Sequence, residues 1–407
     1  MSRIDELIAE LCPDGVPYRP LGEVGSFTRG TGMQKKDLTD SGVPAIHYGQ
    51  IHTRYGIWTT EAKSFVAPEF ASRLRTAEPG DLAIATTSGD DDAVGKAVAW
   101  LGQVPAAVSG DAYVYRHSLE PKYVAYFFQC EQFQEQKKRW ITGTKVRRVS
   151  GDSLAKIMIP VPPLEVQREI VRILDTFTEL EAELEAELEA RQRQYAHYWD
   201  SLLTPRAGWR KMTVGQIADI FDGPHATPKK TIAGPWYLSI SSLRDGRFDL
   251  TESAHLGEDE FAAWTSRVAP RPGDTLFSYE TRVGQAAYWD RDEPAALGRR
   301  MGLLRPRESM VDPRFLTLAF LGPQFQALVR TKTVHGATVN RIPIANMAMW
   351  EMSIPPLDEQ ARIVCILDKF DALVNDLSIG LPAELAARRK QYEHYRDRLL
   401  TFKEAAA

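Results

Sequence analysis

Residues 161–177 read VPPLEVQREIVRILDTF, and residues 354–370 read IPPLDEQARIVCILDKF, which is the same pattern 193 residues later. A second pair follows: residues 191–203 read RQRQYAHYWDSLL and residues 388–400 read RRKQYEHYRDRLL, here 197 residues apart. The second copy has therefore gained four residues between its two halves. One chain carries two closely similar rods, as a homodimer would.

The blocks between the rods are also related, although more weakly. Short motifs recur at the same offset of 193 residues: Leu21-Gly22-Glu23-Val24 with Val214-Gly215-Gln216-Ile217, Pro79-Gly80-Asp81 with Pro272-Gly273-Asp274, and Gly143-Thr144-Lys145-Val146 with Gly336-Ala337-Thr338-Val339. This period is too long for a solenoid, whose units run roughly 20–50 residues. The pattern indicates a duplicated module in which a globular domain precedes a rod.

The duplication predicts four segments. We expect a first globular domain at 1–155 with a helix at 3–12, a first rod at 156–204, a second globular domain at 205–350 and a second rod at 351–402. Each globular block combines short strand-like runs with an aromatic helix after a proline. The predicted class is α+β: two mixed α/β domains separated by two long helices that pack as an antiparallel coiled coil, with a pseudo-two-fold internal repeat.

Apolar residues in the rods follow the three- and four-residue spacing of a helix. The first rod is predicted to run from Leu164 to about Thr204, or roughly 60 Å at 1.5 Å per residue. Its centre repeats Leu-Glu-Ala-Glu from Leu180 onward. One narrow apolar stripe needs a partner helix, and the other rod supplies one. The residues predicted for the spacer or subunit contact are Ile173, Phe177, Leu180, Leu184, Leu188, Tyr195, Ile366, Phe370, Leu373, Leu377 and Tyr392.

The second rod differs in its middle, where residues 378–383 read SIGLPA. Gly380 and Pro382 are predicted to break or kink the helix, with Pro382 opening a new segment. The four extra residues are close to one helical turn, so length changes in fours leave the apolar stripe nearly in phase. An alternative remains open, in which the rods are not a pair but two unrelated surface helices on each domain.

Composition places the chain among ordinary globular proteins. Its 407 residues are too many for one core, 43% of them are hydrophobic and 26% are charged. Cys12, Cys130 and Cys365 are too few and scattered for a disulfide framework or a zinc site. The start has no apolar signal region, and no stretch approaches the ~18 apolar residues of a membrane span. We therefore expect a cytoplasmic protein.

Signals for catalysis are poor. Residues 89–97 resemble a phosphate loop, but the glycines are one residue too far apart and Ala97 replaces the magnesium-binding hydroxyl residue. We interpret Asp90-Asp91-Asp92 as a solvated loop rather than a metal site, because the corresponding stretch in the second domain has no such run. No tetrad of the amino-methyltransferase type is present. The expectation is no catalytic residue and no metal ligand in this chain.

The charge is segregated, although the net charge is only −4. Acidic residues dominate 165–190, whereas 137–148 hold six bases and no acid. Basic groups beside glycine turns are typical of phosphate contacts, and amide and guanidinium groups also pair with adenine and guanine. A solvated basic face remains the alternative for any single residue. The predicted DNA-binding residues are Lys137, Lys138, Arg139, Thr144, Lys145, Arg147, Arg148, Arg299, Arg300, Lys332, Thr338, Asn340 and Arg341.

The PPLxxQxxIVxILDxF run and the RxxQYxxYxxxLL ending, each present twice, resemble the specificity subunit of bacterial type I restriction–modification systems. The Leu-Glu-Ala-Glu repeats are similar to those of the subgroup whose spacer carries tandem tetrapeptides. Residues 7–16, LIAELCPDGV, resemble that subgroup's start. The resemblance covers the whole chain in order.

This resemblance implies two target-recognition domains, each of which reads one half of an asymmetric split site in double-stranded DNA. It implies that two modification subunits, which bind S-adenosylmethionine, dock on the helices. Restriction subunits, which use ATP and magnesium, would join them, and this chain itself would bind no cofactor and catalyse nothing. Two rival readings remain: an assembly scaffold that does not touch DNA, and a self-contained methyltransferase or nuclease.

Overall fold

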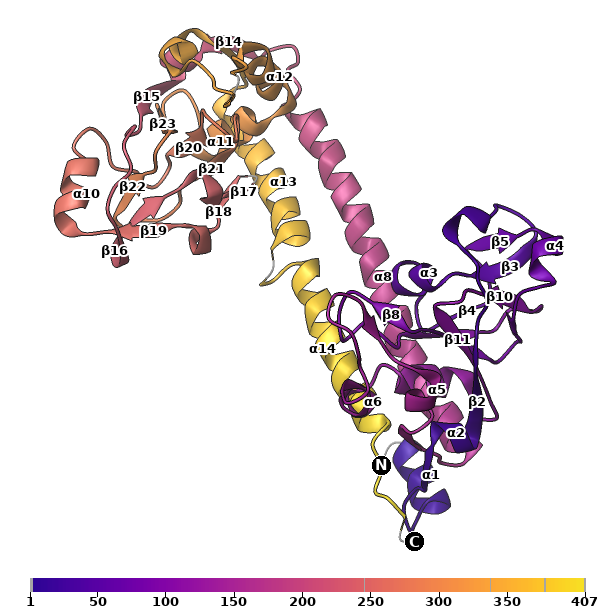
Figure 1. Cartoon of the computed structure of the whole chain (residues 1–407). Coiled ribbons are helices and arrows are strands. Elements are labelled where there is room, and N and C mark those ends of the chain that lie inside the picture. Colours follow the sequence, from indigo (N-terminus) through magenta and orange to yellow (C-terminus); the bar gives the residue numbers. More distant parts are fainter. Residues whose placement is uncertain (1–2, 245, 337, 377, 406–407) are drawn as a thin grey trace. The chain divides into compact units, whose positions relative to one another are not determined.

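A computed structural model describes residues 3–244, 246–336, 338–376 and 378–405. The chain forms two compact units. Unit 1 contains Met1–Glu185 and Leu385–Ala407, and unit 2 contains Ala186–Glu384. Each unit therefore combines one globular domain with parts of both rods, and the expected α+β class is confirmed within each (Figure 1).

The globular domain of unit 1 contains two larger sheets. One has the order β2-β11-β7-β9-β4 and the other β5-β3-β10-β6, and the pairs β1-β13 and β12-β8 stand apart. The strands are β1 (Tyr18–Pro20), β2 (Gly25–Arg29), β3 (Val43–Ile46), β4 (Trp58–Thr59), β5 (Ser64–Val66), β6 (Thr76–Ala77), β7 (Leu82–Ala85), β8 (Thr87–Ser88), β9 (Ala97–Trp100), β10 (Ala106–Val108), β11 (Ala112–His117), β12 (Arg147–Arg148) and β13 (Met158–Pro160). The helices are α1 (Arg3–Leu11), α2 (Leu21–Val24), η1 (Lys35–Asp37), α3 (Tyr48–Thr53), α4 (Pro68–Ala71), α5 (Pro121–Phe127), α6 (Glu131–Lys138) and α7 (Gly151–Leu154).

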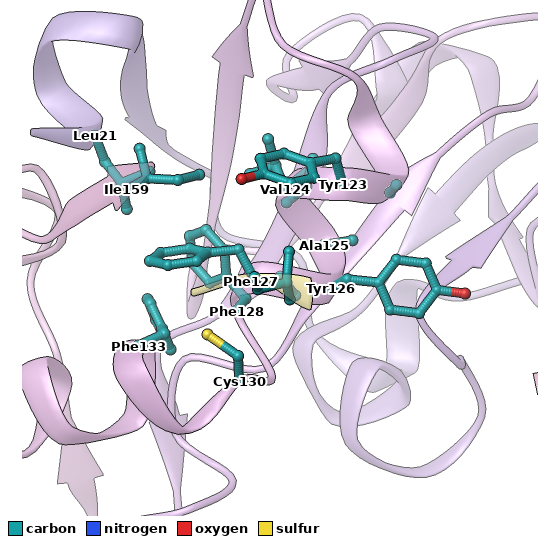
Figure 2. Packing of buried hydrophobic residues seen from close by; sticks show 14 of the residues in the cluster. Leu21, Tyr123, Val124, Ala125, Tyr126, Phe127, Phe128, Cys130, Phe133 and Ile159 are labelled. Atoms are coloured by element: carbon teal, nitrogen blue, oxygen red, sulfur yellow. The ribbon is translucent and has the colours of Figure 1, made fainter. Parts of the chain in front are cut away.

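The core of unit 1 is built around α5, the aromatic helix that follows a proline. Pro121 occupies its first turn, where a missing N–H costs nothing. Figure 2 shows Phe127 and Phe128 beside Phe133 and Cys130, whereas the Tyr126 ring points away from them. The Phe128 and Phe133 rings lie 4.4 Å apart. Because Tyr123 to Phe128 are all buried, this helix has no solvent face and ties the sheet to the first rod.

The globular domain of unit 2 repeats this plan with its own lengths. Its larger sheets have the orders β15-β23-β20-β21 and β19-β16-β22, and the pairs are β14-β24 and β17-β18. The strands are β14 (Arg210–Thr213), β15 (Ala218–Asp222), β16 (Lys230–Leu238), β17 (Leu243–Arg244), β18 (Arg247–Phe248), β19 (Ala254–Leu256), β20 (Thr275–Ser278), β21 (Ala286–Tyr288), β22 (Ala295–Leu297), β23 (Met301–Pro306) and β24 (Glu351–Ile354). The helices are α9 (Val214–Ile217), η2 (Ile240–Ser242), η3 (Leu250–Glu252), α10 (Glu258–Trp264), α11 (Pro313–Leu321), α12 (Pro323–Lys332) and η4 (Ile344–Met349).

The repeated Pro-Gly-Asp motif forms the same turn in both domains. Gly80 and Gly273 have φ of +99° and +98°, which a side chain rarely adopts. The buried Asp81 carboxylate accepts from the Arg116 guanidinium at 2.9 Å, and the buried Asp274 carboxylate accepts from Arg305 at 2.7 Å. The motif recurs in the sequence because it closes the strand pair at the centre of each core.

The repeated glutamine of the rods joins each helix to its domain. The Gln167 side chain accepts from the Glu120 backbone N–H at 2.9 Å and donates to the Pro162 carbonyl at 2.7 Å. Gln360 accepts from the Asp312 N–H at 2.7 Å and donates to the Pro355 carbonyl at 2.8 Å. Both glutamines are buried, so their amides satisfy backbone groups that water cannot reach. This explains why the position recurs in both copies.

The first rod is one helix, α8 (Leu164–Leu203), whereas the second consists of α13 (Leu357–Asn375) and α14 (Leu381–Leu399). Figure 1 shows α13 and α14 as separate helices. The predicted break at Gly380–Pro382 is thus confirmed. A side chain at Gly380 would lie 2.6 Å from the Ala372 carbonyl oxygen, so only glycine fits there.

Within each unit the two rods run antiparallel. In unit 1, the Phe177 and Tyr395 rings stack at 5.3 Å, and Glu181, one turn further along α8, pairs with the earlier Arg389 of α14. In unit 2, Tyr198 of α8 lies 5.1 Å from Phe370 of α13. Arg206, just beyond the end of α8, reaches back to Glu359 at 3.7 Å. The alternative of unrelated surface helices is excluded within each unit.

The apolar stripe is less continuous than the sequence predicts. Leu180 and Leu373 are 43% and 37% exposed, so the expectation that they lie in a buried stripe is wrong. Other predicted positions are at least half-buried, namely Ile173, Phe177, Leu184, Leu188, Tyr195, Ile366, Phe370 and Tyr392. Leu377 lies outside the described residues. Aromatic contacts and ion pairs therefore join the remaining buried leucines in holding the helices together.

No described helix is both long and apolar enough to cross a membrane.

Candidate nucleic-acid interface

Each globular domain projects a hairpin at the same place in its fold. In unit 1, Thr142 and Arg148 exchange two backbone hydrogen bonds of 2.9 Å, and Arg148 pairs with Thr87 of β8. In unit 2, Val334 and Arg341 exchange bonds of 2.8 and 3.1 Å, and Arg341 pairs with Glu280. Thr87 and Glu280, like Arg148 and Arg341, are separated by the repeat offset of 193 residues. The two hairpins are therefore equivalent.

A glycine begins the turn of each hairpin. Gly143 has φ of +92°, and a side chain there would lie 2.1 Å from the Val146 carbonyl oxygen. A side chain at Gly336 would likewise lie 2.6 Å from the Val339 carbonyl oxygen. The turns close too tightly for any other residue, which is why this glycine survives in both copies while its neighbours differ.

The first hairpin presents an exposed basic surface. Thr144, Lys145 and Arg148 are exposed. Arg147 is half-buried, since its guanidinium contacts the Asp91 carboxylate at 2.8 Å and donates to the Gly143 carbonyl at 2.6 Å. Arg147 therefore supports the loop as well as contributing charge. Lys138 and Arg139, at the end of α6, are also exposed.

Lys137 does not belong to this surface, and its prediction as a DNA-binding residue is wrong. Its side chain is fully buried, and the ammonium donates to the carbonyls of Asp92 at 3.0 Å and Val94 at 2.8 Å and to the Gln134 side chain. Burial lowers the pKa of this lysine to about 8, while the negative charge of Asp90, Asp91 and Asp92 opposes the fall. Lys137 anchors the loop at 89–95 from below. Hydrogen bonds within the protein therefore hold the loop at 89–95 in place.

The second hairpin carries different chemistry. Lys332, Thr338, Asn340 and Arg341 are exposed, and the His335 ring lies 3.2 Å from the Asn340 side-chain oxygen. Arg300 has φ of +63° and contacts the Glu280 carboxylate at 3.0 Å. Glu280 is also the backbone partner of Arg341, so Arg300 lies beside the hairpin but is neutralised there. Arg299 is exposed, and the Tyr237 hydroxyl holds its backbone N–H at 2.9 Å.

Sequence reasoning missed a second pair of equivalent features. Residues 40–42 and 232–235 are looped out of the strand ladder, because Thr39 and Pro44 both face Phe65 and Thr231 and Trp236 both face His255. The threonine hydroxyl just before each loop donates to the carbonyl two residues on, at 2.8 and 2.9 Å. The tips are unlike: Asp40 in unit 1 and Ile232, 98% exposed, in unit 2. The sequence signal that could have revealed these loops is the Thr-x-x-Gly spacing, which occurs twice, 192 residues apart.

A further group behind the first hairpin also escaped the sequence reading. The His52 ring on α3 lies 2.9 Å from the Thr87 carbonyl of β8, which is the strand that pairs with the hairpin. The Lys96 ammonium donates to the Tyr55 carbonyl at 3.1 Å, and burial lowers its pKa. These contacts position the strand beneath the hairpin. No spacing in the sequence links them.

The described residues contain no group of three or more histidine, cysteine or acidic side chains placed to hold a metal ion. The acids of 90–92 instead serve the loop, since Asp91 pairs with Arg147 and the Asp90 side chain accepts from the Ala93 N–H at 2.7 Å.

Two domains of one plan, each with a glycine-tipped hairpin and each joined to paired helices, define a class of duplicated two-domain recognition proteins. The family described as "Type I restriction modification DNA specificity domain" matches twice, at residues 13–190 and 207–387. The chain belongs to this family of type I restriction–modification specificity proteins.

Its relatives carry the same description. The chain is 34% identical over 301 residues to the Type I restriction enzyme EcoR124I/EcoR124II specificity subunit of Escherichia coli, covering 69% of this chain and 70% of that protein. It is 31% identical over 274 residues to a putative type I restriction enzyme specificity subunit of Haemophilus influenzae, covering 65% and 68%.

Solved structures share the fold. The HsdS subunit from Thermoanaerobacter tengcongensis matches with a TM-score of 0.53 and 21% identity, over 96% of this chain and 97% of that one. A chain from a structure of type I R-M complex assembly matches with a TM-score of 0.59 and 21% identity, over 96% and 98%.

Proposed function

We propose that this chain is the DNA-reading subunit of a type I restriction–modification assembly. Each globular domain, taken as 1–155 and 205–350, contacts one half of a bipartite DNA site, and the paired helices set the gap between the halves. The observation that carries this proposal is the pair of equivalent hairpins. They share a backbone held by glycine and by the same strand pairing, and both expose an arginine, Arg148 or Arg341, yet other exposed side chains differ, such as Lys145 in one and Thr338 in the other.

The exposed side chains have the chemistry of DNA contacts. Lys145 and Arg148 in unit 1, and Lys332 in unit 2, carry charges that phosphates attract. Asn340 and Arg341 bring an amide and a guanidinium, which pair with adenine and guanine edges in the major groove. Since the two hairpins differ, the two half-sites differ and the target is asymmetric.

In this proposal the chain binds no cofactor and performs no chemistry. Two modification subunits dock on the helices and hold S-adenosylmethionine for the methylation of adenine. Restriction subunits, where present, use ATP and magnesium. The names of the relatives support this division, because each is called a specificity subunit.

Binding of labelled duplex by the chain together with its modification subunits tests the proposal. Alanine at Lys145 and Arg148 should weaken binding about tenfold or more and reduce the slope of log K against log salt by about 2, since each phosphate contact contributes roughly 0.9. Alanine at Lys403, an exposed lysine of the C-terminal tail, is the matched control and should change neither quantity. An unchanged salt slope in the double variant would remove the hairpin from the interface.

The second hairpin has its own prediction. Alanine at Asn340 and Arg341 should relax the base preference in one half-site only, with a loss of roughly 1–3 kcal/mol per lost base contact. Methylation mapping across a host genome reads both half-sites at once. Assembly of the complex with no measurable DNA binding by the unaltered chain would favour the scaffold alternative.

A further inference from the structure

A single arginine of α14 contacts two glutamates of the repeated segment of α8. The Arg389 Nε donates to the Glu181 carboxylate at 2.6 Å, and its Nη2 donates to the Glu185 carboxylate. All three residues belong to unit 1. The two acceptors are four residues apart, so they stand on one face of α8, one repeat after the other. A planar guanidinium fits this arrangement because its N–H groups point in fixed directions.

At this level of the helix pair, Leu385 and Tyr392 of α14 are buried, but the apolar cover of α8 is incomplete. Leu180, which begins the first repeat, is 43% exposed. The nearest aromatic contact joins Phe177 and Tyr395. Phe177 lies one helical turn before Glu181, toward the globular domain. Charged pairs beside a helix seam commonly select the register and partner of a coiled coil. The Arg389 contacts are placed to perform that task.

We infer that Arg389 is a register clamp: a positioning residue that holds α14 against one repeat of α8 and thereby fixes the gap between the two half-sites. This inference rests on the proposed function. It also gives the four-residue repeat a physical reason, since successive repeats present acceptors at the same spacing, as Glu181 with Glu185 and Glu185 with Glu189 do.

The sequence after the repeats limits how many repeats can be deleted before Arg389 loses one of its acceptors. Removal of Glu185–Leu188 brings Glu189 to the place of Glu185, four residues after Glu181, so both acceptors remain. Removal of 185–192 brings Arg193 to that place instead. Arg389 would then face a positive charge. The chain therefore tolerates the loss of one repeat but not of two.

The experiment assembles the full chain with its modification subunits and maps methylation at targets with gaps of every length. Arg389→Glu should raise methylation at gaps one base pair off the preferred length by roughly fivefold relative to the preferred gap, because exposed ion pairs and like-charge contacts each shift equilibria by small factors. Arg389→Glu combined with Glu181→Arg and Glu185→Arg should restore the discrimination. Lys390→Glu, the same charge change one position around the helix, is the control and should have no effect.

Hydrogen exchange in α14 provides a second measure. Exchange should accelerate in Arg389→Glu and return to the original rate in the restored triple variant. The one-repeat deletion should methylate a single shorter gap, whereas the two-repeat deletion should spread over several. A single sharp gap in Arg389→Glu with unchanged exchange would overturn the clamp. Absence of any bipartite target for the unaltered chain would instead overturn the proposed function, so the two failures are distinguishable.

Discussion

The two globular domains place equivalent arginine–aspartate pairs in different surroundings. In unit 1, the buried Asp81 meets Arg116, whose side chain is 59% exposed. In unit 2, the buried Asp274 meets Arg305, whose side chain is only 19% exposed. The turn, the glycine and the carboxylate are the same, yet water screens one pair and hardly reaches the other. A repeated motif therefore preserves geometry without preserving the energy of the interaction.

This comparison predicts the largest effect. Asp274→Ala should destabilise unit 2 by about 3 kcal/mol, because the mostly buried guanidinium of Arg305 loses its carboxylate and keeps, among the described residues, only the Ala269 carbonyl as a hydrogen-bond acceptor. Asp81→Ala should cost clearly less, since Arg116 regains water on most of its surface. Hydrogen exchange of β20 in the Asp274 variant and of β7 in the Asp81 variant, each compared with the unaltered chain, measures the two losses of stability. Equal losses would mean that exposure of the arginine does not decide the strength of the pair.

The hairpin glycines should affect the two half-sites separately. Gly143→Val should open the first hairpin, because its side chain would meet the Val146 carbonyl, and should reduce specific binding by about tenfold to a hundredfold. Gly336→Val should do the same for the other half-site. Gly208→Val is a useful control, since φ is +95° there but no atom lies within 4 Å of the added carbon. Titration with duplexes altered in one half-site at a time assigns each hairpin to its half. Full binding by both hairpin variants would contradict the proposed interface.

The residue that supports the loop beneath the hairpin can change its charge with pH in unit 1 but not in unit 2. Lys137 supports the loop in unit 1, whereas in unit 2 the uncharged Gln326 donates to the Gly284 carbonyl at 2.9 Å. Burial lowers the pKa of Lys137 from 10.5 to about 8. Above pH 8 the unfolded chain thus binds more protons than the folded chain, and the stability contributed by this site rises with pH toward 10.5.

We expect a gain of about 2 kcal/mol at this site between roughly pH 8 and 9.5, which Lys137→Met should abolish. The difference between the two proteins in urea unfolding isolates this residue from other titrating groups. Hydrogen exchange near Gln326 is the internal control and should show no such difference. A rise with pH that survives in the methionine variant would assign it to another group.

The sequence reading succeeded where local chemistry leaves little choice. Gly380 and Pro382 predicted the break in the second rod, and the structure ends α13 at Asn375 and begins α14 at Leu381. The paired Gly143 and Gly336 predicted glycine turns beside the basic residues, and the structure has a tight turn at each, although the sequence did not predict the hairpins around them. Helical spacing likewise predicted the rods.

The reading failed where a side chain's environment depends on distant segments. Lys137 stands in a basic run, but the turn of α6 points it inward to carbonyls some 45 residues earlier in the chain. Leu180 fits the apolar stripe, but it remains 43% exposed in the folded chain. The looped-out tips Asp40 and Ile232 follow from strand register, which spacing alone did not show.

By itself, the sequence determined that the protein is a duplicated module with two helical rods, because helix periodicity, proline and glycine act within a few residues of the chain. Only the tertiary structure decided which charges face water, which arginine joins the rods and which lysine is buried. Those outcomes depend on pairs that lie tens to hundreds of residues apart, such as Arg389 and Glu181, and a pairwise ion contact leaves no periodic trace in the sequence.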